Sequence, residues 1–357
     1  GYLRYVSSVG RVRLMHAPSS PRRVLVSGAG VAGSALAHRL DRQGFDVTVV
    51  EKAASAPAPG RGHAVALGEA AREVADRMGL LPALRAAHVG RRLTTRLDAA
   101  GEVRESVRDA DDALRVRRGD LLAALRAPLE GRVEFLTGDS VATLDDDGDA
   151  VHVAFDSGDF RTYDLVIGAE GPHSNTRRLV FGPERPFHHY HGQVFAGFSL
   201  PNDFGLAHET VVWEAPGRRA SLTAYGPGEP AHACLTLTRE DPPYTVFGDP
   251  WAQRELVRGY FPEQVWQLPV LVREMWRAQD LHVDVVGEIR IRAWSHERVA
   301  LVGDAAWGGS LLAGEGAGKA LVGAYVLGEE LGAGGPHGGA FARYEDLLRG
   351  GAEKVPL

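Results

Sequence analysis

Three glycines near the N-terminus have the spacing of a phosphate-binding turn. Gly28, Gly30 and Gly33 directly follow a short apolar run at residues 23–27. In a strand–turn–helix unit, the first glycine permits a tight turn, the second admits a pyrophosphate, and the third lets the helix pack on the strand. The N-terminus of the helix then presents free N–H groups to the phosphates. The spacing therefore predicts a dinucleotide-binding site.

An acidic residue stands where such a site needs an acceptor for ribose hydroxyls. Glu51 comes 23 residues after Gly28, at the end of a second apolar run. A carboxylate there accepts hydrogen bonds from the adenosine ribose and repels a 2′-phosphate, which favours FAD or NAD over NADP. We expect the further contacts at this end of the site from Val31, Ala32 and Lys52.

The residues around the glycines predict the elements that position them. Residues 23–27 and 46–50 are typical of buried strands, and residues 34–43 have the apolar spacing of a helix. Two later apolar runs, at 163–168 and 299–303, are also typical of buried strands. The pattern predicts a nucleotide-binding sheet that begins near the N-terminus and resumes close to the C-terminus.

A different pattern interrupts this sheet. Strand-like runs at 210–213, 221–224 and 232–237 are separated by Pro/Gly turns, and two amphipathic helices follow at 251–260 and 265–278. These elements predict an inserted antiparallel sheet. Ligands usually bind at the seam between two such layers, so we expect a pocket there.

Composition excludes several functional classes. The 357 residues suffice for about two domains. Forty Lys and Arg against 46 Asp and Glu give a net charge of −6, which argues against a nucleic-acid or anionic-membrane partner. The single cysteine, Cys234, excludes an intrachain disulfide and a Cys-rich metal site and favours a cytoplasmic location. No apolar run reaches the roughly 20 residues of a membrane span. Residues 1–21 are predicted to be an N-terminal extension.

Three separated motifs resemble those of a known family. Strand-to-turn segments at 164–177 and 298–306, followed by a glycine-rich stretch at 313–318, accompany the glycine turn in order. From Arg22 to about Arg349 the chain resembles the FAD-dependent aromatic hydroxylases, the flavoprotein monooxygenases typified by p-hydroxybenzoate hydroxylase. The resemblance implies an α/β fold, with a doubly wound Rossmann-type FAD domain and an inserted antiparallel β-sheet substrate domain. It also implies tightly but non-covalently bound FAD, with NAD(P)H as a transient reductant.

The resemblance also implies domain boundaries and further site residues. Segments 22–180 and 285–357 would form the FAD-binding domain, and 181–284 the substrate-binding domain. Arg61 and Arg118 match two arginines that approach the cofactor, and Asp304 would bind hydroxyls of the FAD ribitol or ribose. A following helix would direct its N-terminus at the flavin pyrimidine ring, where it stabilises the negative charge of the reduced ring. The residues expected at that helix N-terminus are Gly314, Gly316 and Ala317.

The implied activity is that of a monooxygenase. Such an enzyme would hydroxylate or epoxidise an aromatic or polyketide-like small molecule with NAD(P)H and O2, in natural-product biosynthesis. Residues 194–198 and 223–225 are candidates for the pocket wall, and the sequence assigns no catalytic acid or base. No metal is expected.

The chain departs from the family pattern at two places. The second motif has Glu170-Gly171 where the family usually has Asp-Gly, and no proline lies between Asp304 and Gly314. The glycines at 308–309 predict a loose loop there. This departure motivates a second hypothesis, a non-redox cyclase or other tailoring enzyme that uses FAD as a scaffold. A third is a degenerate fold that binds a ligand or a partner without turnover.

Two other groups of residues have types that could do chemistry, but their arrangement in the sequence does not favour a functional site. The histidines in residues 187–191 resemble a metal cluster in composition, but no acidic or cysteine partner lies nearby in the sequence, so polar strand residues are the preferred interpretation. Glu170, His173 and Ser174 contain the residue types of a hydrolytic triad. They lie within five residues on one turn and lack a Gly-x-Ser-x-Gly elbow, so we reject that interpretation.

Overall fold

The computed structural model describes residues 22–57, 62–108, 113–262, 264–308, 314 and 316–352. The predicted extension at 1–21 and the predicted cofactor residue Arg61 lie outside these ranges, as do residues 309–313 of the glycine-containing loop.

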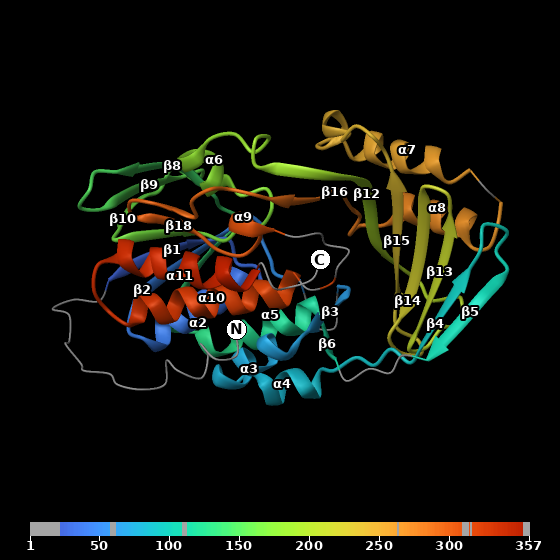
Figure 1. Ribbon diagram of the computed structural model, residues 1–357, viewed down its shortest axis with the longest axis horizontal. Coiled ribbons are helices and arrows are strands. Elements are labelled where there is room, and N and C mark those ends of the chain that lie inside the picture. The colour runs from blue at the N-terminus through green and yellow to red at the C-terminus, as the bar shows by residue number, and fades with distance from the viewer. Residues whose placement is uncertain are drawn as a thin grey trace.

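The first sheet has six strands in the order β17-β18-β11-β1-β2-β7 (Figure 1). Its strands pair in parallel except for β17, which pairs antiparallel with β18 at one edge. The strand bounds are β1 Arg23–Ser27, β2 Asp46–Glu51, β7 Glu134–Thr137, β11 Leu165–Gly168, β17 Ser295–His296 and β18 Val299–Leu301. Strands β1 and β11 are almost continuously apolar because both faces of this sheet are covered.

Alternating side chains of these strands build two cores. Val24 and Val26 point into a large core under a helical layer, whereas Leu25 and Val166 pack under a three-stranded sheet on the opposite side. The helical layer contains α2 Val31–Arg42, α3 Glu69–Arg77, α4 Leu81–Ala86, α5 Arg118–Arg126, a 3₁₀ turn at Ala127–Leu129, α10 Gly316–Gly332 and α11 His337–Ala352. The opposite side carries α6 Asn175–Phe181 with β8 Val141–Asp146, β9 Val151–Phe155 and β10 Phe160–Tyr163. This is the predicted doubly wound FAD-domain architecture.

The second sheet has seven strands in the order β16-β12-β15-β14-β13-β4-β5. Its strand bounds are β4 Leu93–Leu97, β5 Val103–Arg108, β12 His188–Leu200, β13 Glu209–Ala215, β14 Arg218–Ala224, β15 Ala231–Thr238 and β16 His282–Ile289. Helices α7 Pro250–Tyr260 and α8 Leu268–Arg277, preceded by a 3₁₀ turn at Tyr244–Val246, cover one face with a second apolar core. The other face turns toward the FAD domain (Figure 1).

The hairpin β4–β5 belongs to this second sheet. β4 pairs in parallel with β13, so the sheet is not purely antiparallel as the sequence pattern suggested. The predicted segment 22–180 therefore contains one hairpin that belongs to the second sheet. The partner strand is more than a hundred residues away in sequence, and a local apolar pattern carries no information about such a pairing.

A short two-stranded sheet lies where the FAD domain meets the second sheet. It consists of β3 Ala64–Leu67 and β6 Leu114–Arg117, paired antiparallel. The Tyr225 hydroxyl, just beyond β14, accepts a hydrogen bond from the backbone N–H of Ala64 at 3.1 Å. The Arg117 guanidinium lies over the Tyr225 ring, 5.6 Å from its centroid. These contacts fix one end of the second sheet to the cofactor side of the molecule.

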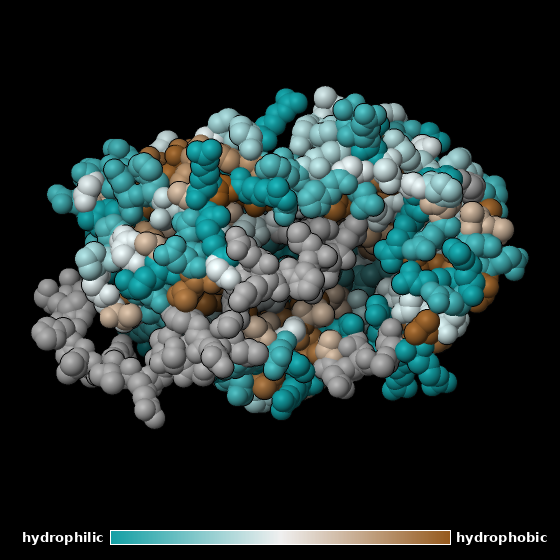
Figure 2. Space-filling model, in the orientation of Figure 1, coloured by the Kyte–Doolittle hydropathy of each residue, from teal (hydrophilic) through white to brown (hydrophobic). Residues whose placement is uncertain are grey.

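The surface in the view of Figure 2 is mainly hydrophilic, with hydrophobic residues in small separate patches. Among the described residues, no helix combines the length and apolar character that crossing a bilayer requires.

Candidate functional site

The glycine turn has the geometry that its spacing predicts. Gly28 has a φ of +102°, and a Cβ there would lie 2.6 Å from the carbonyl oxygen of Ala169 on the neighbouring strand connection. A Cβ on Gly33 would lie 1.8 Å from the carbonyl oxygen of Gly28. Both positions therefore exclude a side chain, which brings β1, α2 and the end of β11 into close contact.

The N-terminus of α2 is open to an anion. Gly30 precedes the first helical residue and supplies no side-chain cap. Val31 and Ala32 are buried in the first turn, so they contribute backbone rather than polar side chains. The nearest described heavy atom to a Cβ built at Gly30 is Nη2 of Arg118, at 3.9 Å. A pyrophosphate here would meet free N–H groups and a guanidinium together, so the residues present fit a dinucleotide.

Glu51 is held in place by the backbone around it. One carboxylate oxygen accepts a hydrogen bond from the N–H of Ala29 at 2.8 Å, and the other from the N–H of Ala53 at 2.9 Å. A carboxylate with two such bonds keeps acceptor capacity for ribose hydroxyls. Lys52 is exposed beside it. The predicted ribose-binding role of Glu51 is compatible with this geometry.

Sequence reasoning missed Arg126 on α5. Its guanidinium donates to the carbonyl oxygen of Ala29 and, at 3.4 Å, to the Ser34 hydroxyl. It thereby holds the glycine turn against α5. The sequence pattern of residues 121–129 indicates no more than a helix, and no motif marks an arginine whose contacts depend on the tertiary structure.

Asp304 begins the short helix α9, Asp304–Trp307, opposite the glycine turn. The preceding Gly303 has a φ of +66°, and a Cβ there would lie 2.8 Å from the Cβ of Ala32. Burial raises the pKa of Asp304 to about 6, although Arg118 and Lys319 act in the opposite direction. Burial makes the ionised form of Asp304 unfavourable because the carboxylate loses hydrogen bonds to water. Hydroxyl groups of a bound ligand could replace those hydrogen bonds.

The N-terminus of α10 approaches the same carboxylate. A Cβ on Gly316 would lie 4.0 Å from the Oδ2 atom of Asp304. Ala317 is half-buried in the first turn, and Gly314 has a φ of +69°. The structure therefore brings the third predicted motif next to the first. The role of these residues toward the flavin ring stays a prediction.

Replacing Asp304 by asparagine is expected to stabilise the FAD-free protein more at pH 8 than at pH 4.5. The folded-state pKa is raised above its usual value, so the ionised carboxylate destabilises the fold, and this cost grows between about pH 4 and pH 6. Because the Asp304 side chain is partly open to water, we expect a gain of only about 1 kcal/mol between the two pH values. Urea unfolding at both pH values measures it, and a pH-independent difference would contradict it.

The departure at Glu170 has a structural explanation. Its carboxylate accepts hydrogen bonds from Ser27 Oγ at 2.8 Å, Ser174 Oγ at 2.6 Å and both the N–H and hydroxyl of Thr176 at 3.1 and 2.5 Å. The side chain thus ties β1 to the first turn of α6. Ser174 also caps α6, accepting from the N–H of Arg177 at 3.0 Å. These bonds give Glu170 and Ser174 structural roles and agree with rejecting a triad.

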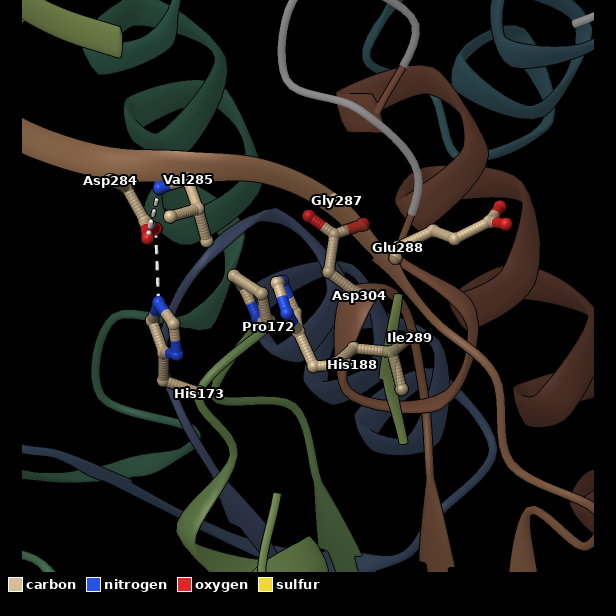
Figure 3. A pocket seen from close by; sticks show the side chains of 10 residues that line it. Pro172, His173, His188, Asp284, Val285, Gly287, Glu288, Ile289 and Asp304 are labelled. Atoms are coloured by element: carbon tan, nitrogen blue, oxygen red, sulfur yellow. Dashed lines mark hydrogen bonds and ion pairs between the residues drawn. The ribbon is translucent and has the colours of Figure 1, made fainter. Parts of the chain in front are cut away.

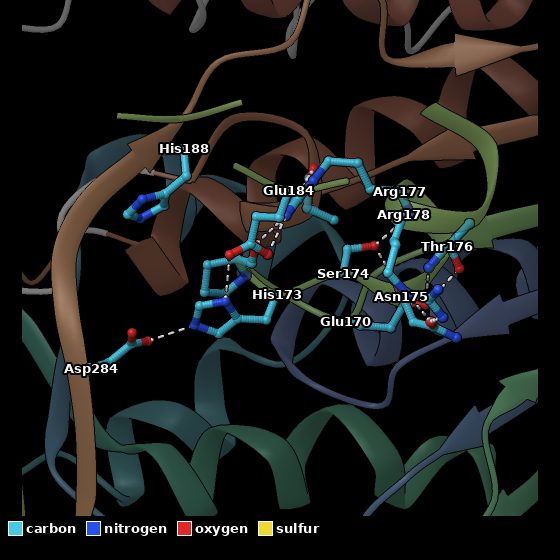
Figure 4. Close-up of polar contacts among 12 residues, drawn as sticks. Glu170, His173, Ser174, Asn175, Thr176, Arg177, Arg178, Glu184, His188 and Asp284 are labelled. Atoms are coloured by element: carbon cyan, nitrogen blue, oxygen red, sulfur yellow. Dashed lines mark hydrogen bonds and ion pairs between the residues drawn. The ribbon is translucent and has the colours of Figure 1, made fainter. Parts of the chain in front are cut away.

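His173 instead links the two sheets (Figure 4). Its Nδ1 donates to Glu184 at 2.9 Å and its Nε2 donates to Asp284 of β16 at 2.9 Å. The hydrogen bonds to Asp284 and Glu184 raise the pKa of His173 to about 10, so the imidazole is a cation at neutral pH. The buried Arg177 donates to Glu184 at 2.8 Å and to the carbonyl of Ala305, next to Asp304, at 3.0 Å. We call Arg177, Glu184, His173 and Asp284 the ionic clamp.

A small pocket lies between the clamp and Asp304 (Figure 3). Strand β16, the turn after β11 and the start of the glycine-containing loop converge on it. Its lining residues are Pro172, His173, His188, Asp284, Val285, Gly287, Glu288, Ile289, Asp304 and Gly308. The predicted seam between the two layers is therefore a pocket that adjoins the candidate cofactor residues.

The start of the glycine-containing loop is not loose as the sequence suggested. The carbonyl of Gly308 accepts a hydrogen bond from the N–H of Ile289 at 3.0 Å, and a Cβ there would lie 3.0 Å from the carbonyl of Asp304. Trp307 stacks on Trp294, with 4.4 Å between ring centroids. Gly308 is thus a close-packing position. Gly309 and the rest of the loop lie outside the described residues.

The histidines at the start of β12 do not gather around a metal site. His188 Nδ1 lies 3.1 Å from the Tyr244 hydroxyl, and His191 lies 3.7 Å from Glu288. Within the described ranges, no group of three His, Cys, Asp or Glu side chains could hold a metal ion. A strand of polar and aromatic residues is the better description of this segment.

Comparison with known proteins identifies the family. The model of the FAD binding domain matches residues 22–335. An uncharacterised protein of Mycobacterium tuberculosis is 36% identical, over 93% of this chain and 91% of its own length. A flavin-dependent monooxygenase from an unknown prokaryotic organism is 32% identical, over 92% of this chain and 86% of its own length.

A solved structure gives the same result for the fold. The crystal structure of the tetracycline destructase Tet(55) superposes with a TM-score of 0.84 and 32% identity, over 94% of this chain and 86% of that one. The predicted fold class and the predicted cofactor, FAD, are confirmed. The chain therefore belongs to the FAD-binding family of flavin-dependent monooxygenases and is an FAD-dependent oxidoreductase.

Proposed function

We propose that this enzyme hydroxylates or epoxidises an aromatic or polyketide-like small molecule in natural-product biosynthesis, with NAD(P)H as reductant and O2 as oxidant. The observation that carries the proposal is the uncovered face of the seven-stranded sheet. This face turns toward the cofactor residues, and Asp284 on it lines the same pocket as Asp304. The solved neighbour named a tetracycline destructase, at 32% identity, supports a polycyclic small molecule.

The uncovered face combines polar and aromatic side chains. The residues of β12, β14 and β15 that point into the core under α7 and α8 alternate with residues that point the other way. Of the predicted pocket wall, four residues lie in that core: Val194, Ala196, Phe198 and Ala224. The side that remains for a substrate is formed by Phe195, Gly197, Ser199, Thr223 and His232. An apolar ring with several hydroxyl or carbonyl groups would be complementary to such a surface.

The residues described above would hold FAD between the two sheets. FAD, when bound, supplies electron transfer from a nicotinamide and the activation of oxygen. The glycine turn and Arg118 would bind its pyrophosphate, and Glu51 its adenosine ribose. Asp304 would bind further hydroxyls, and the N-terminus of α10 would favour negative charge beside it. The second sheet would orient the substrate and exclude water.

The test is the oxygen and reductant dependence of turnover. Without substrate, we expect NAD(P)H oxidation to release hydrogen peroxide, because an unfilled pocket admits water. A true substrate should raise the ratio of hydroxylated product to peroxide, measured by mass spectrometry and a peroxidase-coupled assay. Comparison of NADH with NADPH identifies the reductant.

The non-redox alternative predicts the opposite result. A cyclase that uses FAD as a scaffold would form product anaerobically, with oxidised FAD and no nicotinamide. Product formation under those conditions would overturn the proposal, whereas strict dependence on O2 and reductant would exclude the alternative. A protein that binds FAD and ligand but turns over under neither condition would support binding without catalysis.

A further inference from the structure

The two strands that flank β12 each present a histidine on the face of the second sheet that α7 and α8 leave uncovered. In the register of the sheet, His282 of β16 stands directly opposite Gly197 of β12. On the other side of β12, His232 of β15 stands opposite Ser199. Gly197 and Ser199 share one face because they are two residues apart. No described atom lies within 4 Å of a Cβ built at Gly197, so the described residues leave room over this position, between the strands that carry the two imidazoles.

A third histidine reaches this space from the FAD domain. His63 directly precedes Ala64, whose N–H is bound by the Tyr225 hydroxyl, and the Tyr225 ring lies 5.7 Å from the ring of His232. The N–H of Arg118 donates to the carbonyl of His63 at 3.1 Å. His63 is open to water on one side. Desolvation by the surrounding protein, with Arg118, His232 and His282, nevertheless lowers the pKa of His63 to about 4.

Of the three histidines, we consider His282 first, because its side chain is largely exposed and lacks a hydrogen-bond partner among the described residues. Its side chain is 61% exposed, its ring lies 5.5 Å from that of Phe195, and it makes no hydrogen bond within the described residues. Its Nε2 lies 3.9 Å from Oδ2 of Asp284, beyond hydrogen-bond distance, and that oxygen already accepts from His173. His232, in contrast, has its Nδ1 3.1 Å from the Ser199 hydroxyl.

The groups around these imidazoles keep them uncharged. Desolvation lowers the pKa of His282, the cations His173 and Arg118 add to the shift, and Asp284 opposes it. Desolvation and Arg117 likewise lower the pKa of His232, opposed by Asp280 and Glu229. At neutral pH each imidazole therefore has one nitrogen able to accept a proton.

We propose that His282 is the base that removes the proton from an enolic or phenolic hydroxyl of a substrate bound over Gly197. The O–H bond breaks, the proton passes to the imidazole, and the electron pair stays on the substrate oxygen. That anion is more electron-rich at the adjacent ring or α-carbon, where FAD, when bound, would supply the oxygen. Asp284 stabilises the imidazolium, and the proton returns to the same oxygen when product leaves. The inference rests on the proposed function and narrows its substrate class to acidic hydroxyl compounds.

The acidity of a bound phenol tests this role without turnover. The probe is 4-nitrophenol, whose phenolate has its own visible absorption, titrated into the FAD-loaded enzyme at a series of pH values. In the wild type we expect the bound phenol to ionise with an acidity at least about tenfold greater than in water. The His282→Gln variant should lose this increase, because glutamine accepts a hydrogen bond but takes no proton.

Two controls complete the experiment. His296→Gln alters an exposed histidine of β17 at the edge of the first sheet and should keep the wild-type acidity shift. 4-Nitroanisole, which lacks the hydroxyl, should bind at least about tenfold more weakly than 4-nitrophenol to the wild type. An unchanged shift in His282→Gln, equal binding of the two probes, or no binding of 4-nitrophenol would overturn the inference.

The same preparations separate this inference from the proposed function. NAD(P)H oxidation and peroxide formation are measured beside the titration. Normal flavin reduction without a phenol shift would overturn the role of His282 alone. A His282-dependent shift in an enzyme that NAD(P)H fails to reduce would support the base and contradict the proposed redox function.

Discussion

Replacing Gly33 by alanine is expected to weaken FAD binding by at least about tenfold, or about 1.4 kcal/mol. The added Cβ would lie 1.8 Å from the carbonyl oxygen of Gly28 and 3.3 Å from the Cβ of Ala169. The backbone atom cannot move aside like a side chain, so the turn and α2 must separate. Because the turn aims the N-terminus of α2, the phosphate-binding N–H groups then lose their orientation. Flavin fluorescence during titration of the FAD-free protein measures the affinity.

Gly68→Ala is the matched control for this substitution. Gly68 also precedes a helix, α3, but has a φ of −67° and no described atom within 4 Å of a built Cβ. Alanine there should leave FAD affinity unchanged. If both variants bound FAD with wild-type affinity, the glycine turn would not be the phosphate-binding site.

The first βαβ unit shows what a local pattern can predict. Residues 23–27 and 46–50 correspond to β1 and β2, and the helical spacing after Gly33 corresponds to most of α2. Strands buried on both faces have contiguous apolar runs, and glycines with steric roles stand at fixed offsets. The same locality makes the position of Glu51 predictable, since this residue ends the second strand. The role expected of Asp304 came instead from the resemblance to the FAD-dependent hydroxylases.

The sequence pattern did not predict which strands pair when they are far apart in the chain. Residues 91–107 alternate around Ala100-Gly101, which is typical of a hairpin, but nothing in this pattern indicates that β4 pairs in parallel with β13. Strands β8 and β10 were missed because most of their side chains are partly or fully exposed, with weak apolar alternation. Whether such a segment forms a strand depends on how its side chains pack against the neighbouring sheet, and not on an intrinsic preference of the residues for the strand conformation.

The ionic clamp is the clearest example, within the candidate site, of contacts between residues that are distant in the sequence. His173 and Asp284 are separated by 111 positions and meet across the two sheets. The sequence placed His173 on a turn beside Glu170 and Ser174, and within that window a triad was the only chemistry to consider. His282 was missed for the same reason, because its neighbours come from β12 and from the turn before β3.

Replacing Arg177 by methionine is expected to cost about 3 kcal/mol or more of unfolding free energy. Arg177 is fully buried and joins α6 to Glu184, to the carbonyl of Pro172 and to the carbonyl of Ala305. Methionine has a similar length but no donors, so two backbone carbonyls and a carboxylate lose their partner. Removing one member of a buried ion pair is typically far more costly than the pair is stabilising. Urea unfolding of the FAD-free protein measures the loss.

Arg178→Met is the matched control, because the neighbouring arginine is exposed and its guanidinium hydrogen-bonds only the Asn175 side chain among the described residues. Its change should stay within about 0.5 kcal/mol. Since the Arg177 guanidinium bonds the residue after Asp304, Arg177→Met should also weaken FAD binding in protein that remains folded. Equal stability of the two variants would show that Glu184 and His173 hold this region without Arg177. If Arg177→Met unfolds at a lower urea concentration than the wild type but binds FAD with the same affinity, the ionic clamp stabilises the fold without positioning the cofactor residues.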